Sequence, residues 1–151
     1  MKAAIFASAL SLLACTVTQA QTNSLLGRWQ IEAAAVGPWV APENFHTVKE
    51  DAVRRLLKQR VTFEATAVKS REPLLACKDP RYEPTRIRPA GLFQGGLPEP
   101  QGDIARSLGL PDGVVPGVDV ACSNGGFSYH FRDNDTALVA FDNVIYTLKR
   151  R

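Results

Sequence analysis

Side chains that could carry nucleophilic or acid–base chemistry are few and scattered in this 151-residue chain. Nucleophilic catalysis needs a nucleophile, a base and a group that orients the base. The chain has two histidines, His46 and His130, and no G-x-S-x-G, phosphate-loop or H-E-x-x-H pattern. His130 falls between Tyr129 and Phe131 in a predicted strand, on the face opposite their rings, so we expect an exposed side chain. The sequence therefore favours a protein that is not an enzyme, and an enzyme is the last of the alternatives.

The carboxylates have local explanations that require no ligand. Glu50 and Asp51 suit the start of a helix, where acidic side chains favour the dipole. Asp133-Asn134-Asp135 resembles the opening of a calcium loop, but the glycine and glutamate that should follow are missing. Turn chemistry accounts better for these residues and for Asp142. We predict no metal and no cofactor.

Two cysteines, Cys77 and Cys122, remain once the first twenty residues are set aside. In an oxidising compartment such a pair is most simply a disulfide. It would close a loop of about 46 residues, which the chain-entropy model values at about 4 kcal/mol. A metal site that uses both cysteines with His130 or His46 is the alternative, although no C-x-x-C or H-x-x-x-H spacing supports it.

Residues 1–20 have the composition of an export signal. Lys2 precedes an apolar run at residues 3–14, and small residues lead to Ala20. We expect cleavage after Ala20, which leaves a single β-rich domain at residues 21–151 in the bacterial periplasm. The alternative is a lipoprotein box, Leu12-Leu13-Ala14-Cys15, in which Cys15 is lipidated and anchors the protein to the envelope.

Charge and hydropathy exclude two classes of partner. The formal net charge is +3, and the basic residues are scattered apart from the terminal Lys149-Arg150-Arg151, so no nucleic-acid partner is expected. No second apolar run approaches the roughly 20 residues of a membrane span, so we expect no transmembrane segment in residues 21–151.

The first half predicts strands around one helix. Residues 26–33 have the pattern of a strand with Trp29 and Ile31 facing inward. Apolar and polar residues alternate over residues 61–68, which predicts a strand with one face in solvent. Between them, Thr47 and Glu50 have the spacing of a capping box that would open a helix over residues 48–58.

The middle of the chain is rich in proline and glycine. Residues 82–88 can only form an edge strand because Pro84 interrupts them. Residues 89–117 contain one predicted short helix at 104–108, with Asp103 to cap its start and Gly109 to end it. Within this loop, residues 92–97 would form either a hydrophobic plug or a contact surface. The aromatic and amide residues of the loops that we consider for ligand or partner contact are Trp39, Phe45, Phe93 and Gln94.

The last third predicts an antiparallel meander of strands at residues 118–122, 127–132, 136–141 and 144–148, joined by Asn- and Gly-rich turns. The fold class is therefore mainly β, a small antiparallel barrel or curved sheet with one or two short helices and one disulfide. The predicted inward residues of the meander are Val118, Val120, Cys122, Phe127, Tyr129, Phe131, Val139, Phe141, Val144, Tyr146 and Leu148.

Two families of small barrels share parts of this pattern. Gly27-Arg28-Trp29, with Arg150 after the last strand, resembles the lipocalin-like arrangement, which implies that Arg150 packs over Trp29 and that both close the barrel. The last third resembles bacterial inhibitors of C-type lysozyme, although the inhibitory loop of that family has no match. The residues that carry this second resemblance are Cys122, Gly125-Gly126, Ala137, Tyr146 and Leu148.

These observations favour a non-catalytic exported protein that binds a small molecule or an envelope protein. Inhibition of a cell-wall hydrolase and lipocalin-like carriage of a small apolar molecule are the alternatives. A carrier would need an open apolar cavity beneath Trp29, whereas side chains that fill the barrel would count against it.

Overall fold

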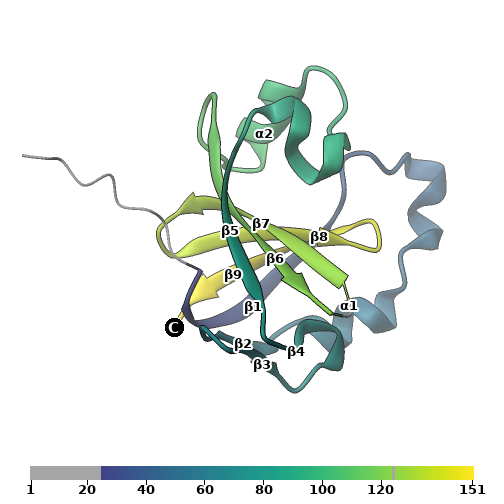
Figure 1. Ribbon diagram of the computed structural model, residues 1–151. Coiled ribbons are helices and arrows are strands. Elements are labelled where there is room, and N and C mark those ends of the chain that lie inside the picture. Colours follow the sequence, from purple (N-terminus) through teal and green to yellow (C-terminus); the bar gives the residue numbers. More distant parts are fainter. Residues whose placement is uncertain (1–24, 124) are drawn as a thin grey trace, which may run out of the picture.

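The computed structural model describes residues 25–123 and 125–151 as one antiparallel sheet curled into a half-barrel (Figure 1). The nine strands lie in the order β4-β3-β2-β1-β9-β8-β7-β6-β5. The predicted export signal, with Cys15, lies outside the described residues. The strands are β1 (Gly27–Val36), β2 (Arg60–Phe63), β3 (Ala67–Ser70), β4 (Cys77–Lys78), β5 (Arg81–Ile87), β6 (Val115–Cys122), β7 (Gly125–Asp133), β8 (Thr136–Phe141) and β9 (Val144–Arg150).

Short helices occupy the connections. The α-helices are α1 (Glu50–Leu56) and α2 (Gln101–Ser107), and the 3-10 segments are η1 (Pro42–Thr47), η2 (Pro73–Leu75) and η3 (Pro89–Gly95). In the described part of the chain, no helix has both the length and the apolar character needed to cross a membrane.

The concave side of the sheet holds the main core. Because side chains alternate across a strand, every second residue of the meander points into it. Trp29, Phe63, Phe131 and Tyr146 are among its largest fully buried side chains. All eleven predicted inward residues of the meander belong to this core or pack against it, so that prediction is confirmed.

A second core lies on the opposite, outer face of the sheet, which the sequence did not predict. Leu138 and Ile145 point outward from β8 and β9 and are buried under η3 and α2. Residues 89–113 therefore cover the outside of the sheet and do not plug an end of the barrel (Figure 1). The buried members of this second core are Leu92, Leu97, Ala105, Leu110, Val115, Leu138 and Ile145.

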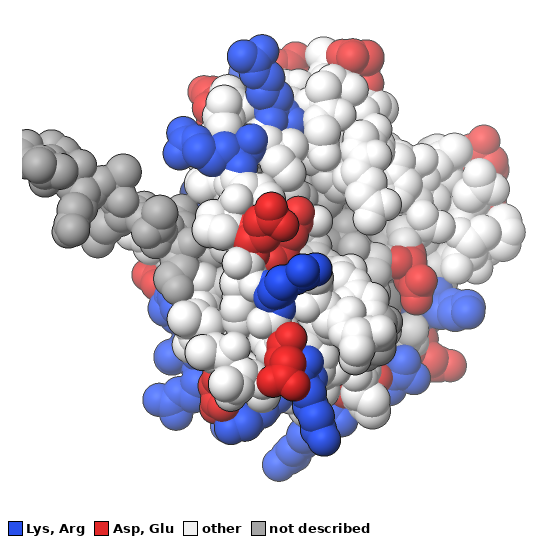
Figure 2. Space-filling view, in the orientation of Figure 1, with Lys and Arg blue, Asp and Glu red and all other residues white. Residues whose placement is uncertain are grey.

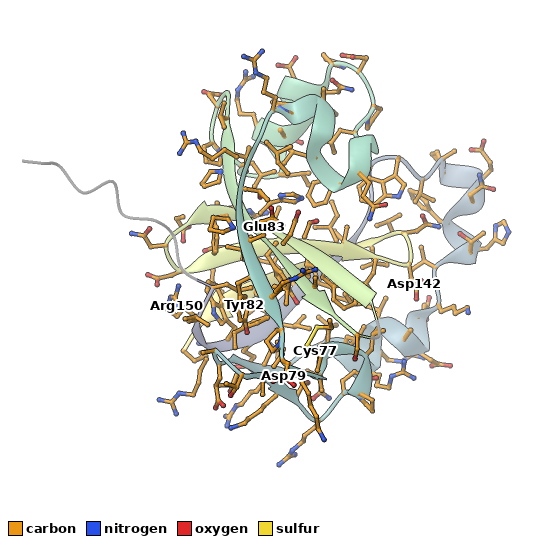
Figure 3. All side chains as sticks on the ribbon, in the orientation of Figure 1. Cys77, Asp79, Tyr82, Glu83, Asp142 and Arg150 are labelled. Carbon is orange, nitrogen blue, oxygen red and sulfur yellow. A yellow bond between two sulfur atoms is a disulfide. The ribbon has the colours of Figure 1, made fainter. Side chains whose placement is uncertain are left out.

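The two edges of the sheet are tied together. Cys77 in the edge strand β4 is bonded to Cys122 at the end of β6, with 5.9 Å between their Cα atoms, which confirms the predicted disulfide (Figure 3). The Tyr82 hydroxyl of the other edge strand, β5, donates a hydrogen bond to the Glu64 carbonyl oxygen at 2.8 Å. The disulfide thus holds the curled shape by linking the edge strand β4 to β6, the strand next to the opposite edge.

Two local predictions are wrong at their boundaries. Residues 61–68 form two strands, β2 and β3, because the chain reverses after Phe63 and pairs Phe63 with Val68. The predicted capping box is absent, since the Thr47 hydroxyl donates to the Asn44 carbonyl oxygen inside η1 and α1 begins only at Glu50.

The second short helix is longer than predicted. It begins at Gln101 after Pro100, so Asp103 lies inside the helix and pairs with Arg106 and does not cap the start. Gly109 follows the helix with a φ of 76°, the left-handed conformation expected of a glycine at this position.

Candidate functional site

A pocket of about 320 Å³ opens on the outer face of the sheet, between β7, β8 and η3. This volume is at the lower end of the range of about 300–1,000 Å³ that is typical of ligand sites. Its lining combines residues of β7 and β8 with residues of the loops that contain Trp39 and Phe93. The lining residues are Trp39, Phe93, Gln94, Gly96, Gly126, Phe127, Ser128, His130, Ala140 and Phe141.

The floor of the pocket follows from the alternation of β7. Gly126, Ser128 and His130 are two residues apart, so they share the outer face of the strand. Gly126 and Ser128 carry little or no side chain, which leaves room above them. His130 stands at the buried end, where only 1% of its surface is exposed.

Aromatic rings form much of the wall. Trp39 and Phe93 lie on the outer face with their ring centroids 5.6 Å apart. Phe127 and Phe141 pack against the main core on the concave face, with ring centroids 5.4 Å apart, and border the pocket where β7 begins and β8 ends. The position of the Trp39 ring is stabilised by a hydrogen bond, because its Nε1–H donates to the Asn143 side-chain oxygen at 3.2 Å. A Cβ on Gly37 would lie 2.4 Å from the Trp39 ring, so only glycine lets the indole pack this closely.

The loop that covers the pocket has a strained backbone. Phe93 and Gln94 both lie in the left-handed region, with φ of 50° and 61°, inside η3. This conformation costs roughly 1–2 kcal/mol for each residue that has a Cβ. Such strain persists only where surrounding contacts hold it, and it is concentrated at ligand sites. Here it turns the Phe93 ring onto His130, with the ring centroids 4.9 Å apart.

His130 is buried, and the expectation of an exposed strand residue is wrong. The outer face of β7 is covered by η3, a layer that the alternation of the strand alone does not reveal. Burial lowers the pKa of His130 from 6.5 to about 4, against a smaller opposing effect of Asp119, so its imidazole is neutral at pH 7. Its Nε2 accepts a long hydrogen bond from the Phe93 N–H at 3.5 Å.

Several polar atoms beside His130 are buried without a hydrogen-bond partner among the described residues. They include His130 Nδ1 and Asp119 Oδ1. Thr85 Oγ1 is another, and it lies across Gly117 from His130: a Cβ on Gly117 would be 2.8 Å from Thr85 Oγ1 and 3.4 Å from His130 Nδ1. A buried polar atom without a partner is unfavourable by about 1–3 kcal/mol, and each such group calls for an explanation.

The predicted contact residues separate into two groups. The structure brings Trp39, Phe93 and Gln94 together in the wall of this pocket. Phe45 lies in η1 with 48% of its surface exposed and is not among the lining residues. The sequence reasoning missed Phe127, Ser128, His130, Ala140 and Phe141. The small residues at positions 126 and 128, on the same face as a histidine, were the available signal for a hollow.

Trp29 and Arg150 meet elsewhere, at the base of the main core. Trp29 is fully buried, and the Arg150 guanidinium lies over its ring. The space that an apolar carrier would need is filled here by large side chains, including Phe131 at 6.3 Å between ring centroids. A small interior pocket beside Phe63 and Tyr129 holds about 30 Å³, roughly the volume of one water molecule.

Other hollows carry less chemistry. A groove of about 250 Å³ between β1 and α1 is lined mainly by alanine and valine, with Glu50 and Arg54 at its rim. The hollow around α1 and Asp142 is lined by exposed charged side chains. Within residues 25–123 and 125–151, no group of three or more histidine, cysteine or carboxylate side chains could hold a metal ion.

Comparisons with known proteins give no further guidance. No family model, no curated protein and no solved structure matches this chain. The class of protein that the structure itself defines is a curled antiparallel sheet with a disulfide between β4 and β6 and an aromatic pocket on its outer face.

Proposed function

We propose that this protein is a non-catalytic binding protein that takes a small organic molecule in the outer-face pocket. The observation that carries the proposal is the combination at one place of aromatic walls, a strained covering loop and the buried imidazole of His130. Ligand sites are usually concave and mainly apolar, with a few polar groups that fix orientation. This pocket has that composition, with Ser128 and His130 as its polar groups.

The proposed ligand is small and flat or ring-shaped. A volume of about 320 Å³ admits a molecule of about one or two rings. The rings of Trp39 and Phe93 can contact such a molecule face to edge or in offset stacks. Gln94 is exposed at the mouth, where its amide can donate or accept a hydrogen bond.

The cellular setting is part of the proposal. The composition of residues 1–20 and the disulfide between Cys77 and Cys122 both suit an oxidising compartment, so we place the protein in the periplasm or, if Cys15 is lipidated, at the envelope membrane. The ligand would then be a compound of the envelope or of the surrounding medium.

The two alternatives from the sequence have less support. A lipocalin-like carrier would use a central cavity, but the interior beneath Trp29 is packed with side chains. Inhibition of a cell-wall hydrolase stays a prediction based on the pattern of the last four strands. No feature of the described surface favours it over the pocket.

A fragment screen against the pocket tests the proposal. Ligand-detected NMR on the purified protein would be run with a panel of neutral one- and two-ring fragments. We expect a subset to bind, and to lose binding in Ala140→Trp, which fills the pocket from β8. The matched control is Ala35→Trp, an exposed alanine in β1 outside this pocket, which should keep the binding.

Each outcome tests a different part of the proposal. Binding that survives Ala140→Trp would place the fragments elsewhere and overturn the assignment of the site. A panel that yields no binder at millimolar concentration would overturn the proposed function itself. Circular dichroism of both variants establishes that a loss of binding is not a loss of the fold.

A further inference from the structure

The outer face of the sheet places unpaired carboxylates beside the aromatic pocket. Glu83, Asp119 and Ser128 form one row across β5, β6 and β7, because Asp119 pairs in register with both of the others. Directly opposed residues in an antiparallel sheet point to the same face, with Cβ atoms about 5 Å apart. Since Ser128 lines the pocket, Asp119 is one strand away from it.

Arg81 lies on the same face of β5 as Glu83, two residues away, but forms no salt bridge with it in the described part of the chain. No salt bridge there involves Glu83 or Asp119, and Asp119 Oδ1 is buried without a hydrogen-bond partner. Figure 2 shows acidic and basic side chains next to one another in the middle of the view, over β5, and Figure 3 places Glu83 on that strand. A buried carboxylate oxygen that receives no hydrogen bond is a strong acceptor, and contact with a cation or an N–H group would stabilise it.

The pocket itself supplies no opposing positive charge. None of its lining residues is lysine or arginine, and His130 is neutral. The next outward residue of β7, Arg132, lies against Gly109, where a Cβ would be 3.1 Å from its Nε. On the same face, Arg81 lies in the row of Gly126, because Arg81 pairs with Ala121 and Ala121 pairs with Gly126. The electrostatic environment of the pocket is therefore set by aromatic faces and by Asp119 on the neighbouring strand, with Arg81 farther away on the edge strand β5.

From this geometry we propose that the pocket selects an organic cation, a protonated amine attached to an aromatic or apolar body. Aromatic ring faces attract cations within about 6 Å, tryptophan most strongly. The body would lie against Trp39 and Phe93, and the ammonium group would lie above Ser128, where the negative charge of Asp119 on the neighbouring strand would attract it. This inference rests on the proposed function and narrows it to one class of ligand.

A pair of probes with the same shape and different charge tests the inference. Benzylamine is protonated at pH 7 and benzyl alcohol is neutral, and both are small enough for the pocket. Their affinities would be measured by NMR titration with wild type and with Asp119→Asn. We expect benzylamine to bind at least about tenfold more tightly than benzyl alcohol, and Asp119→Asn to remove about that factor.

The control substitution is Asp112→Asn, the same chemical change at an exposed aspartate that pairs with Arg106 and does not line the pocket. It should leave the affinity for benzylamine unchanged. If Asp119→Asn does not fold, the salt dependence in wild type replaces it: benzylamine binding should weaken as salt is added, and benzyl alcohol binding should not.

Each outcome decides between the two proposals. Equal affinity for the two probes, or no effect of Asp119→Asn, would overturn the inference and leave the pocket as a site for neutral ligands. The same holds if neither probe binds although neutral fragments do. Failure of every fragment and of both probes would overturn the proposed function together with the inference.

Discussion

The guanidinium carbon of Arg150 lies 4.3 Å from the centre of the Trp29 ring and so joins the end of the last strand to the first strand. The same guanidinium donates to the Leu26 and Asn134 carbonyl oxygens. Trp29 in turn donates from Nε1 to the Leu25 carbonyl oxygen at 2.7 Å. The contact therefore fixes the base of the main core with both a charged and an aromatic group.

Arg150→Gln should destabilise the protein by about 2 kcal/mol, since it removes a cation–π contact and charge-assisted hydrogen bonds. Chemical denaturation would measure the change. Arg151→Gln is the control: its ion pair with Glu32 lies at the surface and should contribute less than about 1 kcal/mol. Equal effects of the two substitutions would contradict a special role for the Trp29 contact.

Reduction of the disulfide should lower the free energy of unfolding by about 4 kcal/mol, because Cys77 and Cys122 are 45 residues apart in the chain. Thermal unfolding with and without reductant would measure the loss, with Cys77→Ala/Cys122→Ala as an independent variant. If both preparations unfold at the temperature of the oxidised protein, the link between β4 and β6 does not stabilise the curled sheet.

The buried imidazole of His130 should make stability fall as the pH drops from about 6.5 to about 4. In this window the unfolded chain binds a proton on His130 that the folded protein excludes, so protonation favours unfolding. The full shift in pKa corresponds to a loss of about 3 kcal/mol in the free energy of unfolding. This loss is absent above about pH 6.5 and complete below about pH 4. Denaturation curves across this range would measure it.

His130→Gln is the control for that pH dependence, because its side chain is polar but does not titrate. The variant should show a flatter profile between these pH values. Asp133 contributes only at lower pH: burial alone would raise its pKa, but hydrogen bonds from Asp135 and Thr136 lower it below 3.8. A profile that is unchanged in His130→Gln would assign the acid sensitivity to other groups.

Gln94→Gly should stabilise the protein by about 1 kcal/mol, because glycine adopts the left-handed backbone at position 94 without a steric penalty. Gly95, already in the left-handed region, provides the contrast, since Gly95→Ala should destabilise. Thermal unfolding measures both. A destabilised Gln94→Gly would indicate that the Gln94 side chain makes contacts that outweigh the strain.

The sequence predicted the strands of the last third and the inward residues of the meander because their alternation and turn residues agree. Phe131 and Tyr146, for example, follow from the period of two alone. The boundary of α1 was missed because Thr47 found a closer acceptor in Asn44, a competition between local hydrogen bonds that spacing does not reveal.

The pocket could be predicted only in part. Trp39, Phe93 and Gln94 were singled out because they were apolar or unusual in a loop, but their convergence depends on how residues 89–113 fold over β7. The expectation of an exposed His130 is wrong for the same reason. Alternation along β7 predicts that one face of the strand is in solvent, but the second core buries that face. Long-range coverage of this kind leaves no periodic signal in the sequence.

The indole N–H signals of the two tryptophans test the central claim most directly. Trp39 lines the pocket and Trp29 is buried in the main core, so one chain carries both the probe and its reference. On titration with a fragment that binds, we predict that the Trp39 signal shifts with saturation while the Trp29 signal stays in place. Saturable binding that leaves Trp39 unmoved, or that shifts both signals equally, would contradict a ligand site on the outer face of the sheet.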